Sequence, residues 1–282
     1  MGIKFIIDSA SDILPSEAEE LGLIHLPLTV LFGEDAYRDA VDLTHQEFYE
    51  KLVESDTLPT TSQVTPAAFE DAYKEITDAG DTAVVITISS KLSGTYQSAM
   101  IAAEDYEGKV FVVDSENVCI GERLLVYRGL ELRYQGLSAA EIADKLNEEK
   151  HQIRLLALLD TLEYLKKGGR ISAAVAFAGN LLSIKPVISV VDGEVSLVGK
   201  ARGSKQGNNL LRELATKGNG INFEKPYALA YSGLSEKLLK KYVADSAELW
   251  ESHTEELPIT TVGCVIGTHV GPGAIAVAYF EK

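Results

Sequence analysis

The first part of the chain alternates short apolar runs with amphipathic segments, and this alternation restricts the possible folds more than any other feature. The segments lie at residues 3–7, 16–21, 26–32, 44–55, 67–79, 83–88, 95–106 and 110–113. Short apolar runs are typical of buried strands, and amphipathic segments are typical of helices that cover a sheet. The alternation predicts β/α units around a mainly parallel sheet with flanking helices.

Polar residues follow several of these strands. Residues 8–12 read Asp-Ser-Ala-Ser-Asp, and Asp114 and Ser115 follow the strand at 110–113. The turn after the strand at 83–88 reads Ser-Ser-Lys-Leu-Ser-Gly-Thr and leads into a helix. Open α/β sheets bind ligands at the carboxyl ends of their strands, and a helix start presents free N–H groups. This turn is therefore predicted to hold a small anion.

The second part of the chain has a different pattern. Ser138 and Glu141 form a capping box, and the pair Asp192-Gly193 between two apolar runs predicts a hairpin. The expected helices are 138–150, 162–167, 173–182, 205–217 and 236–250, and the expected strands are 153–159, 184–191, 195–200, 227–231, 259–266 and 274–280. We therefore expect an N-terminal α/β domain at residues 1–155 and a C-terminal mixed α+β domain at residues 156–282.

The chain is strongly acidic. Its 282 residues include 26 Lys plus Arg and 42 Asp plus Glu, a formal net charge of −16. Because this charge repels phosphate backbones and anionic headgroups, binding to nucleic acid or to a membrane surface is disfavoured. No stretch approaches the roughly 20 apolar residues that cross a bilayer. Cys119 and Cys264 do not form a disulfide framework, so a soluble cytoplasmic protein is predicted.

Residues 57–66 form a second hydroxyl-rich loop. Thr65 followed by Pro66 fits the start of the helix at 67–79. Helix capping explains Thr65 but gives Thr61 and Ser62 no local structural role. A ligand-binding role is therefore favoured for these two hydroxyls.

Ser93 has three possible roles. As a nucleophile it would need a base and a G-x-S-x-G turn, but Lys91 stands where the first glycine would be. As an N-cap it would hold the helix start, and as an unactivated donor it would face a ligand together with the following amides. The last two roles are compatible with each other.

His269 stands between Gly267 and Gly271, in a segment expected to be a loop between two terminal strands. The glycines allow tight turns and close approach, and an imidazole with a pKa near neutrality could donate to a carboxylate switchably. A lone histidine is more often structural. No group of His, Cys or carboxylate residues has the spacing of metal ligands, so no metal is expected.

Two stretches look like nucleotide-binding motifs but lack essential parts. In residues 193–200, five residues separate the glycines, and Ala201 stands where Ser or Thr would hold magnesium. Residues 271–276 match G-x-G-x-x-A, but six residues remain, too few for a βαβ unit. No nucleotide site and no cofactor are predicted.

A basic group stands out in this acidic chain. Residues 166–170 read Lys-Lys-Gly-Gly-Arg, and Arg202 and Lys205 follow later. The lysines and glycines fit the end of a helix. Arg170 is not explained by this, so a role toward a phosphate or a partner stays open for it.

Taken together, these segments resemble the DegV family, which includes the fatty-acid-binding subunits of bacterial fatty acid kinase. The resemblance runs essentially end to end and depends on motifs in the right order, at residues 8–12, 61–66, 89–96, 113–115, 165–172, 185–186 and 267–274. It implies a two-domain α/β fold that encloses one long-chain fatty acid between the domains.

The resemblance also implies roles for particular residues. Thr61 and Ser93 are similar to positions whose hydroxyls bind the fatty carboxylate, with Ser62, the Gly94 amide and His269 beside them. The basic residues are similar to surface positions that face the kinase or the acyl phosphate, namely Arg170, Arg202 and Lys205. A separate kinase subunit would supply ATP, and this chain would present the acid as a carrier with no catalytic residues of its own.

Two other functions stay open at this stage. The first is a serine hydrolase with Ser93 as nucleophile and His269 as base. The second is a sensor of another small carboxylate.

Overall fold

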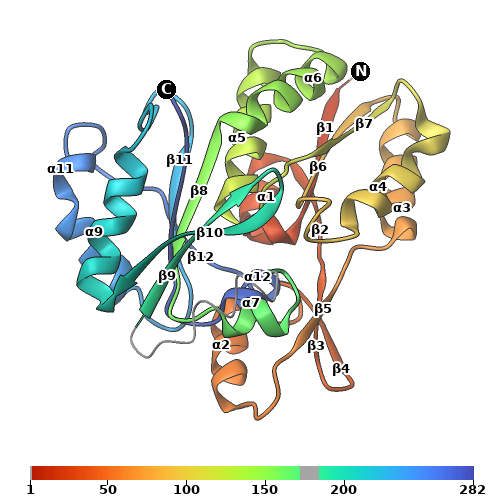
Figure 1. Cartoon of the computed structure of the whole chain (residues 1–282). Helices are drawn as coiled ribbons and strands as arrows, with labels where there is room; N and C mark the ends of the chain where they lie inside the picture. The colour runs from red at the N-terminus through yellow and green to blue at the C-terminus, as the bar shows by residue number, and fades with distance from the viewer. Residues whose placement is uncertain (1, 172–183) are drawn as a thin grey trace.

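The computed structural model of the chain describes residues 2–171 and 184–282. These residues form a four-stranded, a six-stranded and a three-stranded sheet (Figure 1). The helix predicted at 173–182 lies outside the described residues. Among the helices of the described ranges, none combines the length and apolar character needed to cross a bilayer.

The four-stranded sheet is parallel throughout. Its strands, in spatial order, are β2 (Leu23–Leu26), β1 (Ile3–Asp8), β6 (Thr82–Thr87) and β7 (Val110–Asp114). Its sides are covered by α3 (Pro66–Asp78) and α4 (Thr95–Ala103) on one and by α5 (Ile120–Tyr134) and α6 (Ala139–Glu149) on the other (Figure 1). The predicted parallel sheet with flanking helices is confirmed. The chain leaves β1 toward β2 and later returns on the other side as β6, which creates a topological switch point at their carboxyl ends.

The six-stranded sheet is mixed. Its strands, in spatial order, are β10 (Glu194–Arg202), β9 (Ile184–Val191), β8 (Ile153–Leu158), β13 (Ile275–Phe280), β11 (Tyr227–Tyr231) and β12 (Ile259–Thr261). All neighbours are antiparallel except the parallel pair of β11 and β12. Its outer helices are α9 (Gly203–Thr216), α10 (Lys237–Asp245) and α11 (Ala247–Trp250). The predicted mixed second layer is confirmed.

Side chains of the six-stranded sheet alternate between two cores. On β8, Leu155 and Ala157 face the main core, whereas Leu156 and Leu158 belong to a second core that includes Leu211 of α9. This is the period of two that the pleat imposes. The inner face of the sheet is therefore turned toward the parallel sheet.

The third sheet and three further helices lie below the two larger sheets in the view of Figure 1. The sheet consists of β4 (Asp35–Arg38), β3 (Thr29–Phe32) and β5 (Thr60–Ser62). Near it lie α2 (His45–Glu54), α7 (Glu163–Lys167) and α12 (Cys264–Val270) (Figure 1). The remaining short elements are α1 (Pro15–Leu21), η1 (Ser9–Ser11), η2 (Glu104–Tyr106) and η3 (Lys150–Gln152).

Local signals account for several boundaries. The Ser138 hydroxyl accepts from the Glu141 N–H in a complete capping box, as predicted, and Thr65 caps α3 with Pro66 in its first turn. Asp192 and Gly193 have φ values of 49° and 79°, which fit the two-residue turn between β9 and β10. The predicted hairpin is confirmed.

The strand predicted at 259–266 is wrong in its second half. Only Ile259–Thr261 form a strand, and the chain then turns into α12 with Gly263 at its N-cap. His269 therefore lies in the last turn of a helix rather than in a loop. The physical reason is tertiary, because two carboxylates from the N-terminal part of the chain accept the first N–H groups of α12, namely Asp12 and Asp39.

Helix α5 was not predicted from the sequence. It is buried on several sides, with Ile120, Leu124, Leu125 and Leu132 all inaccessible, because it contacts strands of both large sheets. A helix of this kind lacks the polar face that makes amphipathic helices recognisable. The boundary expected after residue 155 falls within β8, and the exact division into domains stays a prediction.

Candidate functional site

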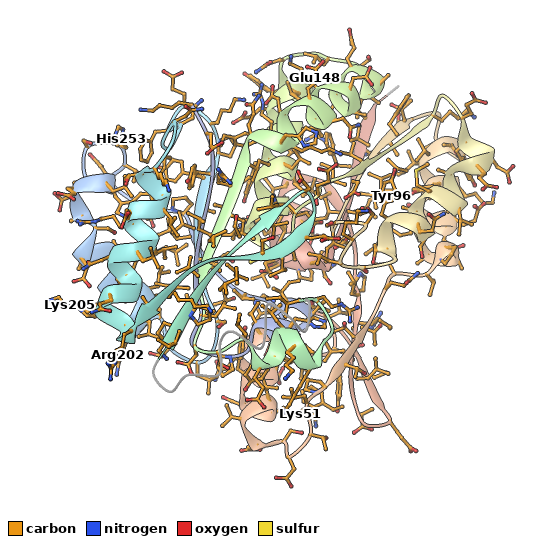
Figure 2. The ribbon with its side chains drawn as sticks, viewed as in Figure 1. Lys51, Tyr96, Glu148, Arg202, Lys205 and His253 are labelled. Atoms are coloured by element: carbon orange, nitrogen blue, oxygen red, sulfur yellow. The ribbon has the colours of Figure 1, made fainter. Side chains whose placement is uncertain are left out.

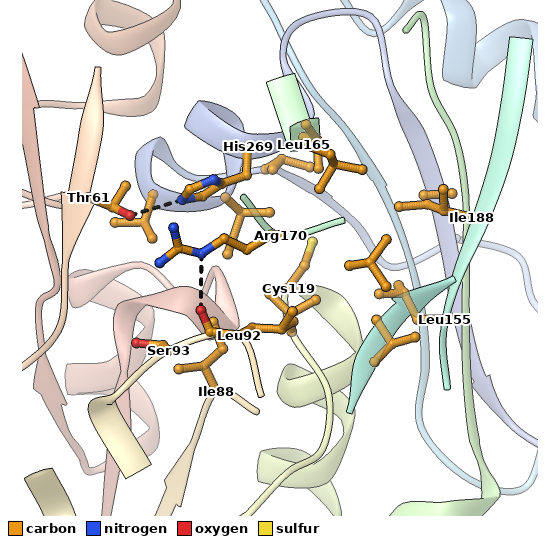
Figure 3. Close-up of a pocket in the computed structure, with 18 of the residues that line it drawn as sticks. Thr61, Ile88, Leu92, Ser93, Cys119, Leu155, Leu165, Arg170, Ile188 and His269 are labelled. Atoms are coloured by element: carbon orange, nitrogen blue, oxygen red, sulfur yellow. Dashed lines mark hydrogen bonds between the residues drawn. The ribbon is translucent and has the colours of Figure 1, made fainter. Parts of the chain in front are cut away.

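An internal cavity of about 300 Å³ lies between the carboxyl edge of the parallel sheet and the inner face of the six-stranded sheet (Figure 3). Its wall includes Ile88 and Leu92 from the turn after β6, and Leu155 and Ile188 from β8 and β9. The tip of the β9–β10 hairpin joins the two sides, because the Ser89 hydroxyl donates to the Gly193 carbonyl at 2.7 Å. The predicted ligand-binding edge of the parallel sheet therefore forms part of the wall of this cavity.

Polar and apolar residues are separated along the cavity. Figure 3 shows Thr61, Ser93, Arg170 and His269 at one end, while Leu155 and Ile188 lie at the other. The four polar residues are partly exposed, whereas Leu155 and Ile188 at the other end are buried. Such a cavity suits a ligand with a long apolar body and one polar head.

Thr61 and His269 form the first polar pair. The Thr61 hydroxyl lies 2.9 Å from Nε2 of His269, although 208 positions separate the two residues (Figure 3). His269 Nδ1 is buried and has no hydrogen-bond partner among the described residues. A buried N–H without an acceptor is costly, so we place the proton on Nε2, which donates to Thr61. The Thr61 proton then remains available for a ligand.

His269 is not a switch near neutrality. Burial, and secondarily the Arg170 guanidinium, lowers the pKa of His269 to about 4, which corrects the expectation of a switchable donor. Its ring also needs Gly168, because a Cβ there would lie 2.2 Å from Nδ1. The imidazole contacts Thr61, so it would act on a ligand through that hydroxyl.

The titration of His269 can be measured directly. The pKa of His269 in the folded protein lies below its ordinary value. The contribution of neutral His269 to the free energy of unfolding is therefore lost as the pH falls from about 6.5 through 4. We expect imidazole ¹⁵N NMR to show the neutral Nε2–H tautomer from pH 8 down to pH 5. An imidazolium spectrum for His269 at pH 6 would contradict this assignment, and His269→Gln identifies the signal.

Ser93 and Gly94 form the second part of the polar end. Gly94, not Ser93, holds the N-cap position of α4, and the Ser93 hydroxyl accepts from the Thr95 N–H at 3.2 Å. Gly94 packs closely against the Gln63 side chain, since a Cβ there would lie 2.0 Å from Oε1 of Gln63. Gln63 in turn donates to the Ser98 hydroxyl at 2.7 Å. The two predicted hydroxyl loops are thus in direct contact.

Arg170 differs most from its expected position. It was expected at the surface, but it is partly buried and lines the cavity. Its guanidinium donates to the Leu92 carbonyl at 3.2 Å and to the Gly168 carbonyl at 2.6 Å (Figure 3). A positive charge is therefore part of the polar end.

The remaining predicted residues lie farther out. Ser62 lines the cavity but is exposed. It neighbours Thr61 on β5, and successive side chains on a strand point to opposite faces, so only one of them can face His269. Arg202 and Lys205 are exposed at the junction of β10 and α9, at the lower left in Figure 2.

Helix α12 is anchored by buried carboxylates. Asp12 accepts from the Gly263 N–H at 3.0 Å, and Asp39 accepts from the N–H groups of Cys264 and Val265 at 3.0 and 3.4 Å. Burial raises the pKa of Asp12 to about 8. These contacts determine where the helix that bears His269 begins.

One group within residues 2–171 and 184–282 has possible metal ligands close together. The ligand atoms of Asp39, His45 and Cys264 lie within 4.8 Å of one another. Both Asp39 oxygens already accept N–H groups of α12, and Cys264 Sγ donates to the Leu43 carbonyl. These hydrogen bonds account for the arrangement, and the expectation of no metal stays a prediction.

Small residues that leave room for the cavity were not predicted from the sequence. Ala157 on β8 pairs with Ala276 on β13, and both line the cavity. A signal was present, because residues 274–278 read Ala-Ile-Ala-Val-Ala and so place small side chains on one face. The pairing with Ala157 could not be inferred from either strand alone.

Comparison with known proteins assigns the chain to a family. A family model described as an uncharacterised protein of the DegV family matches residues 2–282. A DegV domain-containing protein of Caldanaerobacter subterraneus is 33% identical over 282 residues, 99% of each chain. A solved structure from Thermus thermophilus, described as fatty acid binding of a DegV family protein, is 33% identical with a TM-score of 0.87 over 100% of both chains.

A second solved structure agrees. DegV of Bacillus subtilis, described as a fatty acid binding protein, is 31% identical to this chain with a TM-score of 0.83, again over 100% of both chains. The resemblance and the two-domain α/β fold expected from the sequence motifs are both confirmed. The chain belongs to the DegV family.

Proposed function

We propose that this protein binds one long-chain fatty acid, with its tail in the apolar cavity and its carboxylate at the polar end. The observation that carries the proposal is the separation of the cavity into a buried apolar end with Leu155 and Ile188 and a partly exposed polar end with Thr61, Ser93 and Arg170. The relatives from Thermus thermophilus and Bacillus subtilis are described as binding fatty acids, which supports it.

The geometry favours a carrier over a hydrolase. Ser93 Oγ contacts Thr95, and the His269 imidazole contacts Thr61, so no hydrogen bond joins Ser93 to that base in the described structure. Its lowered pKa also makes His269 a weak base. We therefore assign no catalytic residue to this chain.

The proposal includes a partner. The carboxylate end is the partly exposed end, so a bound acid would face a separate ATP-dependent kinase subunit in the cytoplasm, and this chain would present it for phosphorylation. Exposed Arg202 and Lys205 supply positive charge in an acidic protein and are proposed to face that subunit or the acyl phosphate. A direct test measures how fast a purified bacterial fatty acid kinase subunit with ATP phosphorylates palmitate bound to the wild-type protein and to Arg202→Glu. If Arg202 faces that subunit or the acyl phosphate, phosphorylation should be slower in Arg202→Glu.

The bound ligand can be identified without assumptions. Mass spectrometry of an organic extract from the purified protein should reveal a long-chain fatty acid, and the delipidated protein should bind added palmitate or oleate. Recovery of no lipid together with no binding of either acid would overturn the proposal. Recovery of a different small carboxylate would instead support the sensor function.

Replacing Ser93 with alanine tests the headgroup site. The change removes one donor to the carboxylate, which we expect to cost about 1 to 3 kcal/mol, so palmitate affinity should fall by roughly five- to 150-fold. Titration calorimetry measures the change. Ser90→Ala is the matched control, because Ser90 is exposed in the same turn. Unchanged affinity in Ser93→Ala would remove Ser93 from the site.

A further inference from the structure

Thr95 connects the two hydroxyl loops beneath the polar end. It is the first residue of α4, and its side chain is inaccessible to solvent. Its Oγ1 lies 2.9 Å from Ser93 Oγ and accepts from the Val64 N–H at 3.4 Å. Thr95 does not line the cavity, so any effect on a ligand must pass through Ser93.

The direction of the Ser93–Thr95 hydrogen bond follows from counting donors and acceptors. Within the described residues, the Thr95 hydroxyl contacts the Val64 N–H and the Ser93 hydroxyl. The first of these is a donor, so only Ser93 can accept the Thr95 proton. If Ser93 donated instead, a fully buried hydroxyl proton would have no acceptor, which is costly.

Ser93 is thereby left with one free proton. Its oxygen accepts from both the N–H and the hydroxyl of Thr95. A serine hydroxyl has one proton and two lone pairs, so both acceptor positions are occupied. The proton must point away from Thr95, toward the cavity that Ser93 lines.

We infer that Thr95 is a positioning residue, whose hydroxyl donates to Ser93 and so directs the Ser93 proton at the fatty carboxylate. The inference rests on the proposed function. Ser93 and Thr61 are then arranged alike. At Thr61, the His269 Nε2–H group donates to the hydroxyl oxygen, so the Thr61 proton remains for the ligand. Both ligand-facing hydroxyls are then oriented before the ligand arrives, which lowers the cost of binding.

The test compares two variants and two ligands of equal chain length. Thr95→Val keeps the shape but removes the hydroxyl, and Thr95→Ser keeps the hydroxyl. We expect Thr95→Val to lower palmitate affinity about tenfold, because the Ser93 proton can turn away, and to lower 1-hexadecanol affinity less, because a neutral hydroxyl accepts a weaker hydrogen bond than a carboxylate. Thr95→Ser should bind palmitate with the affinity of the wild-type protein. In a Ser93→Ala background, Thr95→Val should have no further effect.

Several outcomes would overturn the inference. The first is an unchanged palmitate affinity in Thr95→Val. The second is a loss of affinity in Thr95→Val that is equal for palmitate and 1-hexadecanol. The third is a loss of palmitate affinity in the double variant that equals the sum of the losses in Ser93→Ala and Thr95→Val. Wild-type protein that binds neither ligand would overturn the proposed function itself, and wild-type binding of palmitate separates the two cases.

A measurement on the wild-type protein covers the case in which Thr95→Val fails to fold. Neutron diffraction of the palmitate complex locates exchanged hydroxyl deuterium atoms. The Thr95 deuterium is expected between its oxygen and Ser93 Oγ, with the Ser93 deuterium toward the carboxylate. A Ser93 deuterium that points at Thr95 would reject the inference.

Discussion

Replacing Ala157 with phenylalanine is expected to lower the affinity for palmitate by about 100-fold or more. Ala157 is buried, lines the cavity and stands opposite Ala276 on the neighbouring strand. An aromatic ring there occupies space that the acyl chain needs. If about four methylenes are displaced at ~0.8 kcal/mol each, the loss is about 3 kcal/mol, or about 100-fold. Titration calorimetry with palmitate measures it.

Two further variants make this result interpretable. Ala36→Phe introduces the same ring on β4, where Ala36 is exposed, and should leave binding unchanged. Ala157→Val fills less space, so it should shift the preference toward shorter acids. Thermal unfolding shows whether each variant is folded. A folded Ala157→Phe protein with wild-type palmitate affinity would mean that the tail does not lie in this cavity.

The second large effect is expected at Asp39. This carboxylate is 1% exposed and accepts from the Ser9 hydroxyl, the Cys264 N–H and the Val265 N–H. In Asp39→Asn, one oxygen becomes an amide that cannot accept, so buried donors lose their partner. We expect a loss of about 3 kcal/mol in the free energy of unfolding, measured by denaturant titration. Because α12 bears His269, palmitate affinity should fall as well.

Asp35→Asn provides the control for Asp39→Asn. Asp35 is exposed on the adjacent strand β4, so the same chemical change there should alter stability by less than about 0.5 kcal/mol. If Asp39→Asn unfolds at the same denaturant concentration as Asp35→Asn, the carboxylate does not anchor α12. If it is destabilised yet binds palmitate normally, α12 keeps its position by other contacts.

Several elements in both parts of the chain could be predicted because their signals are local. The capping box at Ser138 and the turn at Asp192-Gly193 each depend on a few neighbouring residues. Helix α5 could not be recognised in this way. It is buried between the two large sheets, so its sequence lacks the polar face that periodicity detects.

The same distinction between local signals and tertiary contacts applies to the candidate site. The hydroxyls of Thr61 and Ser93 could be identified because each follows a recognisable local pattern. Arg170 was misplaced, because nothing near it in sequence indicates that its guanidinium is held by the Leu92 carbonyl, 78 positions away. The contact between His269 and Thr61 joins residues that are even farther apart, at 208 positions.

The sequence by itself determined the β/α order, the hairpin and the two hydroxyl loops, because hydrophobic period and turn chemistry act over a few residues. Only the tertiary structure decided where α12 begins, since Asp39 and Cys264 are 225 positions apart when they form their hydrogen bond. It also decided that Ala157 meets Ala276 and leaves a cavity. A cavity is space that no residue fills, so it exists only once distant strands are paired.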